Sequence, residues 1–373
     1  MSIWKQAKQV GCIIGRSWEY QFTFTIKQME NIKLTRRSFL KTMGLGALSM
    51  LLPAPVSDAS AALIELDPPL ARILRYKLLI HEEPNALSKN SGFFKYDDII
   101  SLPKLMHVEN IFKKKVGWYQ ISDTEYIEAA WVQPVFNRIN AIPKDPIPEG
   151  GTLGEITVPF VHVYFEPNRI NVNRTFYFEN NFWVLRLEQD EFGKPWYELW
   201  DDLNGMSYYV PAEAVHLTKP EEITPLSTDV APDAKRIELD LYKQEIRAFE
   251  YDRQVFQTLC STGIRDGLTP VGRWMTNRKR PCRRMVNEPA NPNVYDLPGV
   301  PWVSYITLFG VAFHGAFWHS NWGNVMSNGC INMKAEDAKW IYRWTNPTVP
   351  FDQFYHTEET GTQVDVLTGY GGF

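Results

Sequence analysis

Alternating hydrophobic and polar residues recur through the last third of the chain and predict β-strands. Arg236–Leu241 alternates in this way, and Gln244–Phe249 begins a second such stretch. Short strands dominate up to Ala335. Ala335–Trp344 is then the strongest helix candidate in this half, and Pro347 ends it. We therefore predict a mainly β domain that contains one helix.

Two aromatic-led segments earlier in the chain resemble each other. In each, a valine follows a tryptophan by fourteen positions: Trp118 to Val132, and Trp196 to Val210. Each segment predicts a strand, a polar turn and a second strand that ends in an aromatic residue and the valine. The pair resembles tandem bacterial SH3-like barrels. The alternative is two aromatic hairpins within one irregular β domain.

Proline-rich and glycine-rich stretches mark the expected domain boundaries. Pro143–Gly154 separates the two aromatic segments, and Lys219–Pro232 has the composition of a linker. The expected organisation is a first SH3-like domain with an N-terminal extension, a second one, a linker and a C-terminal domain, at residues 62–142, 155–218, 219–234 and 235–367.

The N-terminus has the three parts of a cleavable export signal. Basic Leu34–Lys41 contains paired arginines, Met43–Leu52 is apolar, and Ala59–Ala61 is a run of small residues. Ten apolar residues are too few to span a bilayer, which needs about twenty. Residues 1–61 resemble a twin-arginine signal, with Met29 as an alternative start. The resemblance implies an extracytoplasmic protein, in the periplasm or cell wall. A soluble amphipathic helix is the alternative.

Composition and charge argue against a disordered or fibrous protein and against binding to nucleic acid or an anionic membrane. The 44% hydrophobic and 22% charged residues are typical of globular chains. The net charge is −4, and without residues 1–61 the chain holds 31 basic and 40 acidic residues, a net charge of −9. This balance does not favour nucleic acid or an anionic membrane as partner. We expect neither a nucleic-acid partner nor stable membrane insertion, and the sequence leaves the oligomeric state open.

Four cysteines are too few and too scattered for a disulfide scaffold or a CxxC metal site. A disulfide between Cys260 and Cys282 is disfavoured, because twin-arginine substrates are exported already folded from a reducing cytosol. Cys330 follows His314 by sixteen residues, and a nucleophilic thiol needs a neighbouring base. Gly329 would let a carbonyl approach and free the N–H groups of Gly329 and Cys330 as oxyanion donors. A structural, buried Cys330 is the alternative.

Two ordered motifs resemble the L,D-transpeptidases, whose catalytic domain is the YkuD type. His314-Gly315 is followed by Ser327-x-Gly329-Cys330-x-Asn332. Upstream, Ser261-Thr262-Gly263 and Thr269-Pro270-Val271-Gly272 match a strand end and a hairpin of that family. The likeness covers about 235–367, with Gly361–Val366 as the last strand. It implies a β-sandwich catalytic domain with a helix after the nucleophile.

The resemblance implies roles for individual residues. Cys330 is the nucleophile, His314 its base, and the Gly315 carbonyl orients that base. Ser327, Gly329 and Asn332 shape the nucleophile loop. Asn328 stands where the family usually has histidine, and an amide cannot carry a proton. His319 is either a compensating group or, as we favour, a solvent-facing residue of a lid.

Aromatic and basic residues near the motif are candidates for substrate binding. The aromatic set could wall a groove or could pack in the core; it comprises Trp302, Phe317, Trp318 and Trp322. The basic set could meet substrate carboxylates, although a solvated charged loop is slightly favoured; it comprises Arg278, Lys279, Arg280, Arg283 and Arg284.

The reaction implied by the family is acyl transfer between peptidoglycan stem peptides, with no metal or organic cofactor. Cys330 would attack the carbonyl at the L-centre of a diamino acid, D-alanine would leave, and an amine of a neighbouring stem would form a 3-3 cross-link. Alternatives are an L,D-carboxypeptidase, a protein-anchoring enzyme and a catalytically silent wall-binding protein. A papain-type peptidase is excluded because its cysteine precedes its histidine.

Overall fold

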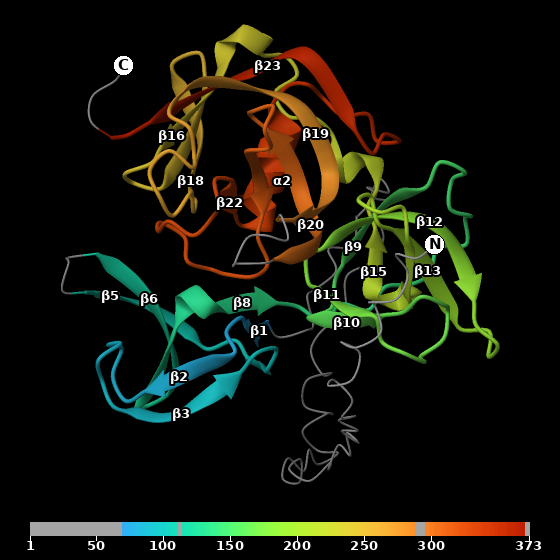
Figure 1. Cartoon of the computed structure of the whole chain (residues 1–373), viewed down its shortest axis with the longest axis horizontal. Helices are drawn as coiled ribbons and strands as arrows, with labels where there is room; N and C mark the ends of the chain where they lie inside the picture. The colour runs from blue at the N-terminus through green and yellow to red at the C-terminus, as the bar shows by residue number, and fades with distance from the viewer. Residues whose placement is uncertain (1–68, 111–113, 288–294, 370–373) are drawn as a thin grey trace, which may run out of the picture. The chain divides into compact units, whose positions relative to one another are not determined.

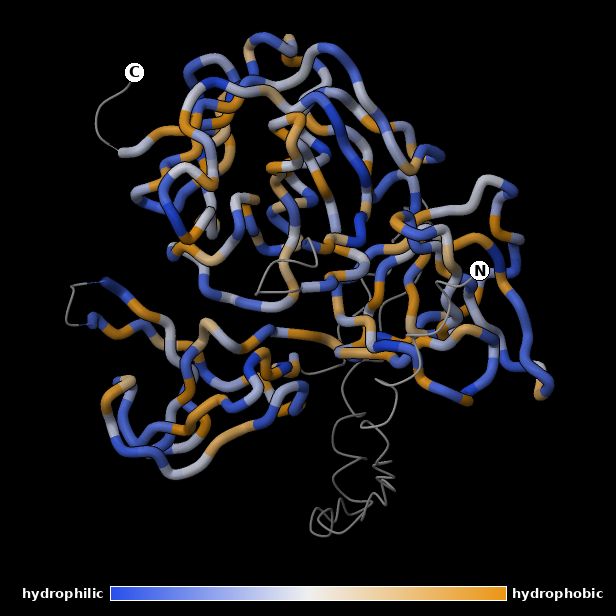
Figure 2. The backbone as a smooth tube through the Cα atoms, viewed as in Figure 1, coloured by the Kyte–Doolittle hydropathy of each residue, from blue (hydrophilic) through white to orange (hydrophobic). Residues whose placement is uncertain are grey.

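The computed structural model describes residues 69–110, 114–287 and 295–369. The predicted export signal at 1–61 and its alternative start at Met29 lie outside the described residues. All the described residues belong to one compact unit. Hydrophobic and hydrophilic positions alternate along many of the strands, as Figure 2 shows.

The first part of the described chain, residues 69–135, forms two small sheets. A three-stranded sheet has the order β4-β1-β8, and a five-stranded sheet has the order β3-β2-β7-β6-β5. Their core includes Ile73, Leu78 and Ile127. The strands are β1 (Leu70–Ile73), β2 (Lys77–His81), β3 (Asn90–Lys95), β4 (Ile99–Ser101), β5 (Lys104–Glu109), β6 (Lys115–Ser122), β7 (Glu125–Glu128) and β8 (Val132–Val135).

The second part forms a five-stranded sheet of order β14-β13-β12-β9-β15 and a separate hairpin of β10 and β11. Since β9 begins at Thr152, this part starts three residues before the boundary expected at 155. The expected linker contains two short 3-10 segments, Pro220–Ile223 and Pro232–Ala234. The strands are β9 (Thr152–Ile156), β10 (Phe160–Val163), β11 (Arg174–Tyr177), β12 (Asn181–Gln189), β13 (Pro195–Trp200), β14 (Ser207–Pro211) and β15 (Val215–Leu217).

The two aromatic segments share an order of elements, but the equivalence of their valines is wrong. Strands β6 and β7 lead through the 3-10 turn Ala129–Trp131 to β8, and β13 and β14 lead through Ala212–Ala214 to β15. Val132 therefore begins the strand after the turn, whereas Val210 lies in the strand before it. The β13–β14 connection is the longer one, which makes the fourteen-residue spacing a coincidence. The SH3-like resemblance of the two segments stays a prediction.

The C-terminal part is built on an eight-stranded sheet of order β18-β17-β16-β23-β19-β20-β21-β22. Helix α2 (Ala335–Trp344) packs on β20 and β21, as Figure 1 shows in orange and red. The β16–β23 and β21–β22 pairs are parallel. The strands are β16 (Lys235–Asp240), β17 (Glu245–Glu250), β18 (Arg253–Leu259), β19 (Gly272–Val286), β20 (Asp296–Tyr305), β21 (Ala312–Gly315), β22 (Ile331–Met333) and β23 (His356–Leu367).

The sequence pattern predicted three elements of this C-terminal part, but the expectation of short strands up to Ala335 is wrong for β19, with 15 residues, and β20, with 10. Strands β16 and β17 lie within one residue of the predicted ranges, and α2 has the predicted bounds. Local alternation and helical pattern sufficed here because each element buries one face in a common core. Within the part of the chain that the structure describes, no helix is long and apolar enough to cross a membrane.

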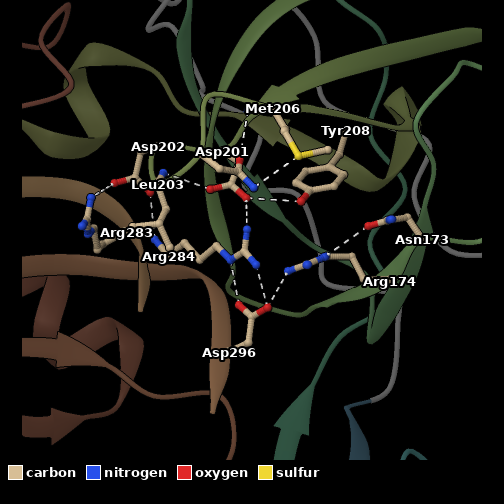
Figure 3. Close-up of polar contacts among 11 residues, drawn as sticks. Asn173, Arg174, Asp201, Asp202, Leu203, Met206, Tyr208, Arg283, Arg284 and Asp296 are labelled. Atoms are coloured by element: carbon tan, nitrogen blue, oxygen red, sulfur yellow. Dashed lines mark hydrogen bonds and ion pairs between the residues drawn. The ribbon is translucent and has the colours of Figure 1, made fainter. Parts of the chain in front are cut away.

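The basic set on β19 is not a solvated loop, which corrects the favoured interpretation. Arg283 Nη1 lies 2.5 Å from an oxygen of Asp202, and Arg284 Nη1 lies 2.5 Å from an oxygen of Asp201. Lys279 is fully buried, and its Nζ donates to the carbonyls of Tyr342 and Thr345 at the end of α2. Figure 3 shows Arg283 and Arg284 turned toward the two aspartates. These cations are paired with groups from other parts of the fold. A local run of charges in the sequence does not reveal such partners.

Candidate active site

Parallel pairing of β21 with β22 sets the strand of the candidate base beside the strand that follows the candidate nucleophile. His314 pairs with Asn332, and Phe313 pairs with Ile331. Phe313 and Ile331 point into the core. Since side chains alternate along strands, His314 and Asn332 share the opposite face. Cys330 directly precedes β22, so the strand after Cys330 lies beside the strand that carries His314.

The His314 ring is oriented by its own strand. Its Nδ1 lies 3.0 Å from the carbonyl oxygen of Gly315, the residue expected to orient it. With Nδ1 donating, Nε2 is left as the basic nitrogen. Burial lowers the pKa of His314 to about 4, although the bond to Gly315 opposes this. At neutral pH the ring is therefore an uncharged proton acceptor.

Gly315 permits a close approach that a side chain would prevent. A Cβ at this position would lie 2.8 Å from Pro301 Cγ and 3.0 Å from the Ala335 Cα. The strand that carries the base thus packs directly against β20 and the first residue of α2.

Cys330 is half-buried, and its Sγ donates to the carbonyl oxygen of Gly310 at 3.7 Å. Burial raises the pKa of the thiol, while a hydrogen bond with the Ala312 backbone acts in the opposite direction. A raised thiol pKa and a lowered imidazole pKa both favour the neutral pair over a thiolate and imidazolium.

The backbone N–H of Gly329 is not free for an oxyanion, which corrects one expectation. It donates to Ser327 Oγ at 3.0 Å, and Ser327 Oγ donates to the Cys330 carbonyl oxygen at 2.5 Å. Gly329 also has φ +131°, and a Cβ there would lie 2.6 Å from the carbonyl oxygen of Leu268. Ser327 and Gly329 therefore shape a tight loop in front of the nucleophile.

Residues of the upstream motif form hydrogen bonds with this loop. Ser261 exchanges two backbone hydrogen bonds with Asn332, and the N–H groups of Met326 and Ser327 donate to the carbonyl of Thr262. Thr269 Oγ1 accepts from the Gly263 N–H at 3.0 Å and donates to the Gly329 carbonyl at 2.8 Å. One buried hydroxyl thus ties both motifs together, a role that the sequence analysis did not assign.

Replacing Thr269 with valine is expected to loosen the nucleophile loop. The change keeps the shape but leaves a buried N–H and a carbonyl without partners, which costs about 1–3 kcal/mol of unfolding free energy. Displacement of Cys330 is expected to lower kcat about 10- to 100-fold. Steady-state kinetics and thermal unfolding check this, with Thr269→Ser expected to retain both values. An undiminished kcat in the valine variant contradicts the role.

His319 is buried, at 1% exposure, so the solvent-facing interpretation is wrong. The Asn321 N–H donates to its Nδ1 at 3.2 Å, and the carboxamide of Asn332 lies 2.9 Å from its Nε2. Burial, with a smaller contribution from His314, lowers the pKa of His319 to about 3. This neutral ring links Asn332 to the loop after β21. Its neighbours come from loop folding that local sequence does not reveal.

Asn328, two residues before the candidate nucleophile Cys330, is exposed. A side-chain hydrogen bond links it to Tyr295. Burial and the nearby Cys330 raise the pKa of that tyrosine, and the bond to Asn328 opposes them. Tyr295 and Gly310 are thus two further neighbours of the thiol that the sequence analysis missed, because both come from other strands' ends.

The candidate groove tryptophans divide into two groups. Trp302 is 2% exposed and packs against Tyr342 in the core, so it does not wall a groove. Trp318 is half-buried, with its ring centroid 5.8 Å from that of His314. Trp322 is half-buried against His319, at 4.9 Å between ring centroids. Only Trp318 directly contacts a candidate catalytic side chain.

Two residues of the N-terminal part, Arg72 of β1 and Ala130 of the 3-10 turn, hold the loop that carries Trp318. Arg72, which is fully buried, donates from Nη2 to the Phe317 carbonyl at 2.5 Å. The Ser320 N–H donates to the Ala130 carbonyl at 2.8 Å. The loop beside the candidate base is therefore anchored by a part of the chain more than 180 residues away.

The described residues contain no group of three or more histidine, cysteine, aspartate or glutamate side chains that could hold a metal ion. Cys260, Cys282 and Cys330 are free thiols. Burial raises the pKa of both Cys260 and Cys282. Neither core thiol is accessible in the way that a nucleophile requires.

These motifs and this geometry agree with a family comparison. Residues 234–366 match the model of the YkuD family, the L,D-transpeptidase catalytic domain. The predicted range of 235–367 differs from this by one residue at each end. The matched segment comprises the eight-stranded sheet and α2, and the mainly β prediction for it is confirmed.

Solved structures of L,D-transpeptidases are also similar to the chain. A C442S mutant from Enterococcus faecium is 21% identical, with 36% of this chain and 50% of that chain covered and a TM-score of 0.29. An L,D-transpeptidase from Mycobacterium smegmatis is 18% identical, covering 49% and 82%, with a TM-score of 0.30. The alignment spans half the length of the Enterococcus protein. No curated protein matches the chain.

Proposed function

We propose that this protein is a peptidoglycan L,D-transpeptidase that acts through Cys330. The observation that supports the proposal is the pairing of β21, which carries His314, with β22, which begins directly after Cys330, inside the segment that matches the YkuD model. The neutral state that the pKa directions of both groups favour supports a thiol activated by a base during attack.

The first step is acylation of Cys330 by a tetrapeptide stem. The sulfur forms a bond to the carbonyl carbon at the L-centre of the diamino acid, and His314 Nε2 takes the thiol proton. When the carbon–nitrogen bond breaks, the same nitrogen returns that proton to the departing amine of D-alanine. The products are a thioester on Cys330, free D-alanine and neutral His314.

The second step transfers the acyl group. A side-chain amine from a neighbouring stem attacks the thioester carbon, the carbon–sulfur bond breaks, and the amine's proton passes through His314 to the sulfur. The product is a cross-link between the third residues of two stems. If water attacks instead, the same site is an L,D-carboxypeptidase, and a protein amine as acceptor would anchor that protein to the wall.

Incubation with disaccharide-tetrapeptides and mass spectrometry test the proposal. We expect a dimer lighter by one alanine for each bond formed. A monomer lighter by one alanine would instead identify a carboxypeptidase. Intact substrate after long incubation, together with a Cys330 thiol that is alkylated no faster than a free thiol, would favour the silent wall-binding protein.

A further inference from the structure

A cavity of about 350 Å³ is lined on one side by Trp318, and neither His314 nor Cys330 belongs to its lining. This volume is within the range of small-molecule sites, roughly 300–1,000 Å³. Its lining comes from three separated parts of the chain: Tyr96, the strand around Arg174 and Tyr177, and the YkuD residues Asp296 and Trp318. Because Trp318 also contacts His314, an occupant of this cavity would lie one side chain away from the candidate base.

The apolar walls of the cavity are aromatic rings held in place. Tyr177 stacks on Phe317, with ring centroids 5.7 Å apart and an interplanar angle of 24°. Tyr96 meets the edge of Tyr177 at 6.4 Å, and Trp318 meets Phe317 at 5.1 Å and 89°. Buried Arg72 fixes this wall: its guanidinium lies 4.1 Å from the Tyr177 ring centroid and donates to the Phe317 carbonyl.

The polar wall of the cavity consists of charged side chains that form ion pairs with one another. Arg174 Nη1 lies 3.4 Å from an Asp296 oxygen, and both oxygens of Asp296 accept from Arg284 at 2.7 Å. Arg284 in turn donates to Asp201, so that cations and carboxylates alternate, as Figure 3 shows. A charged ligand would have to displace one member of this series of ion pairs. A neutral ligand rich in hydroxyl and amide groups can form hydrogen bonds to the paired side chains and leave the ion pairs intact.

We propose that this cavity binds a sugar residue of the peptidoglycan glycan strand. A pyranose ring has apolar faces that suit aromatic walls and a polar rim that suits a paired arginine and aspartate. This inference rests on the proposed function, in which stem peptides reach Cys330 while attached to their glycan. Binding the sugar behind Trp318 would hold the stem beside His314.

The proposal predicts a preference for glycan-linked substrate that depends on Tyr96. This ring is 43% exposed, so its removal spares the core. The ratio of kcat/KM for disaccharide-tetrapeptide over free tetrapeptide is expected to fall about 3- to 10-fold in Tyr96→Ala. Tyr76→Ala, a control at 89% exposure outside the cavity, is expected to leave the ratio unchanged. An unchanged ratio in Tyr96→Ala overturns the proposal.

A binding measurement separates this inference from the proposed function. Saturation-transfer NMR on the full chain with Cys330→Ala uses the peptide-free disaccharide of N-acetylglucosamine and N-acetylmuramic acid. Tyr96-dependent binding without turnover by the unmodified protein would refute the transpeptidase and keep the sugar site. Turnover without Tyr96-dependent disaccharide binding would refute the sugar site and keep the transpeptidase. Stronger binding of free tetrapeptide than of disaccharide at this cavity would reassign it to the peptide.

Discussion

Cys330→Ala is expected to abolish release of D-alanine and dimer formation together, because both steps pass through the thioester on that sulfur. Loss of a covalent nucleophile lowers kcat by about 10⁴-fold or more in enzymes of this kind. Cys330 is half-buried, and its thiol bonds only weakly to the Gly310 carbonyl, so alanine should leave the fold intact. Mass spectrometry of disaccharide-tetrapeptide digests measures both products.

The matched control is Cys260→Ala, which removes another free thiol from the same domain. Cys260 is fully buried and burial raises its pKa, so it cannot serve as an accessible nucleophile. We expect activity to persist in this variant, with some loss of stability from the small cavity. Residual activity above about 1% in Cys330→Ala would place the nucleophile elsewhere.

The acid limb of the pH profile is expected near pH 4, well below the ordinary range of histidine. The base must be neutral to accept the thiol proton, and burial lowers the pKa of His314 to about 4. As pH falls through that value the ring gains a proton, and kcat/KM should then fall tenfold per pH unit. A profile of kcat/KM between about pH 2.5 and 8 measures the limb.

His314→Gln is expected to lower kcat by about 10²- to 10⁴-fold and to remove this limb, because an amide does not titrate. His107→Gln provides the control, since His107 is exposed on β5 of the N-terminal sheets. We expect its profile to match that of the unmodified protein. An acid limb near pH 6.5, or one that persists in His314→Gln, would show that another group is the base.

Residue pattern and family resemblance together located the domain and the candidate pair. Alternation predicted β16 and β17, the helical stretch predicted α2 with its bounds, and the likeness to the L,D-transpeptidase motif singled out His314 and Cys330. These features are local. A strand or a helix must bury one face, so its apolar residues recur at a spacing that can be recognised in the sequence. In the folded chain, the pairing of β21 with β22 then sets the strand that carries His314 beside the strand that follows Cys330.

The partners of individual side chains were decided only by the tertiary structure. The Gly329 N–H is bonded to Ser327, His319 is buried against Asn332, and Trp302 packs in the core. The arginines of β19 meet aspartates some eighty positions away. The β19 arginines and His319 are paired with residues from other elements, Trp302 packs against the helix α2, and the Gly329 N–H is taken by a turn of its own loop. A polar group that is buried on folding must be paired, but the sequence does not say with which residue.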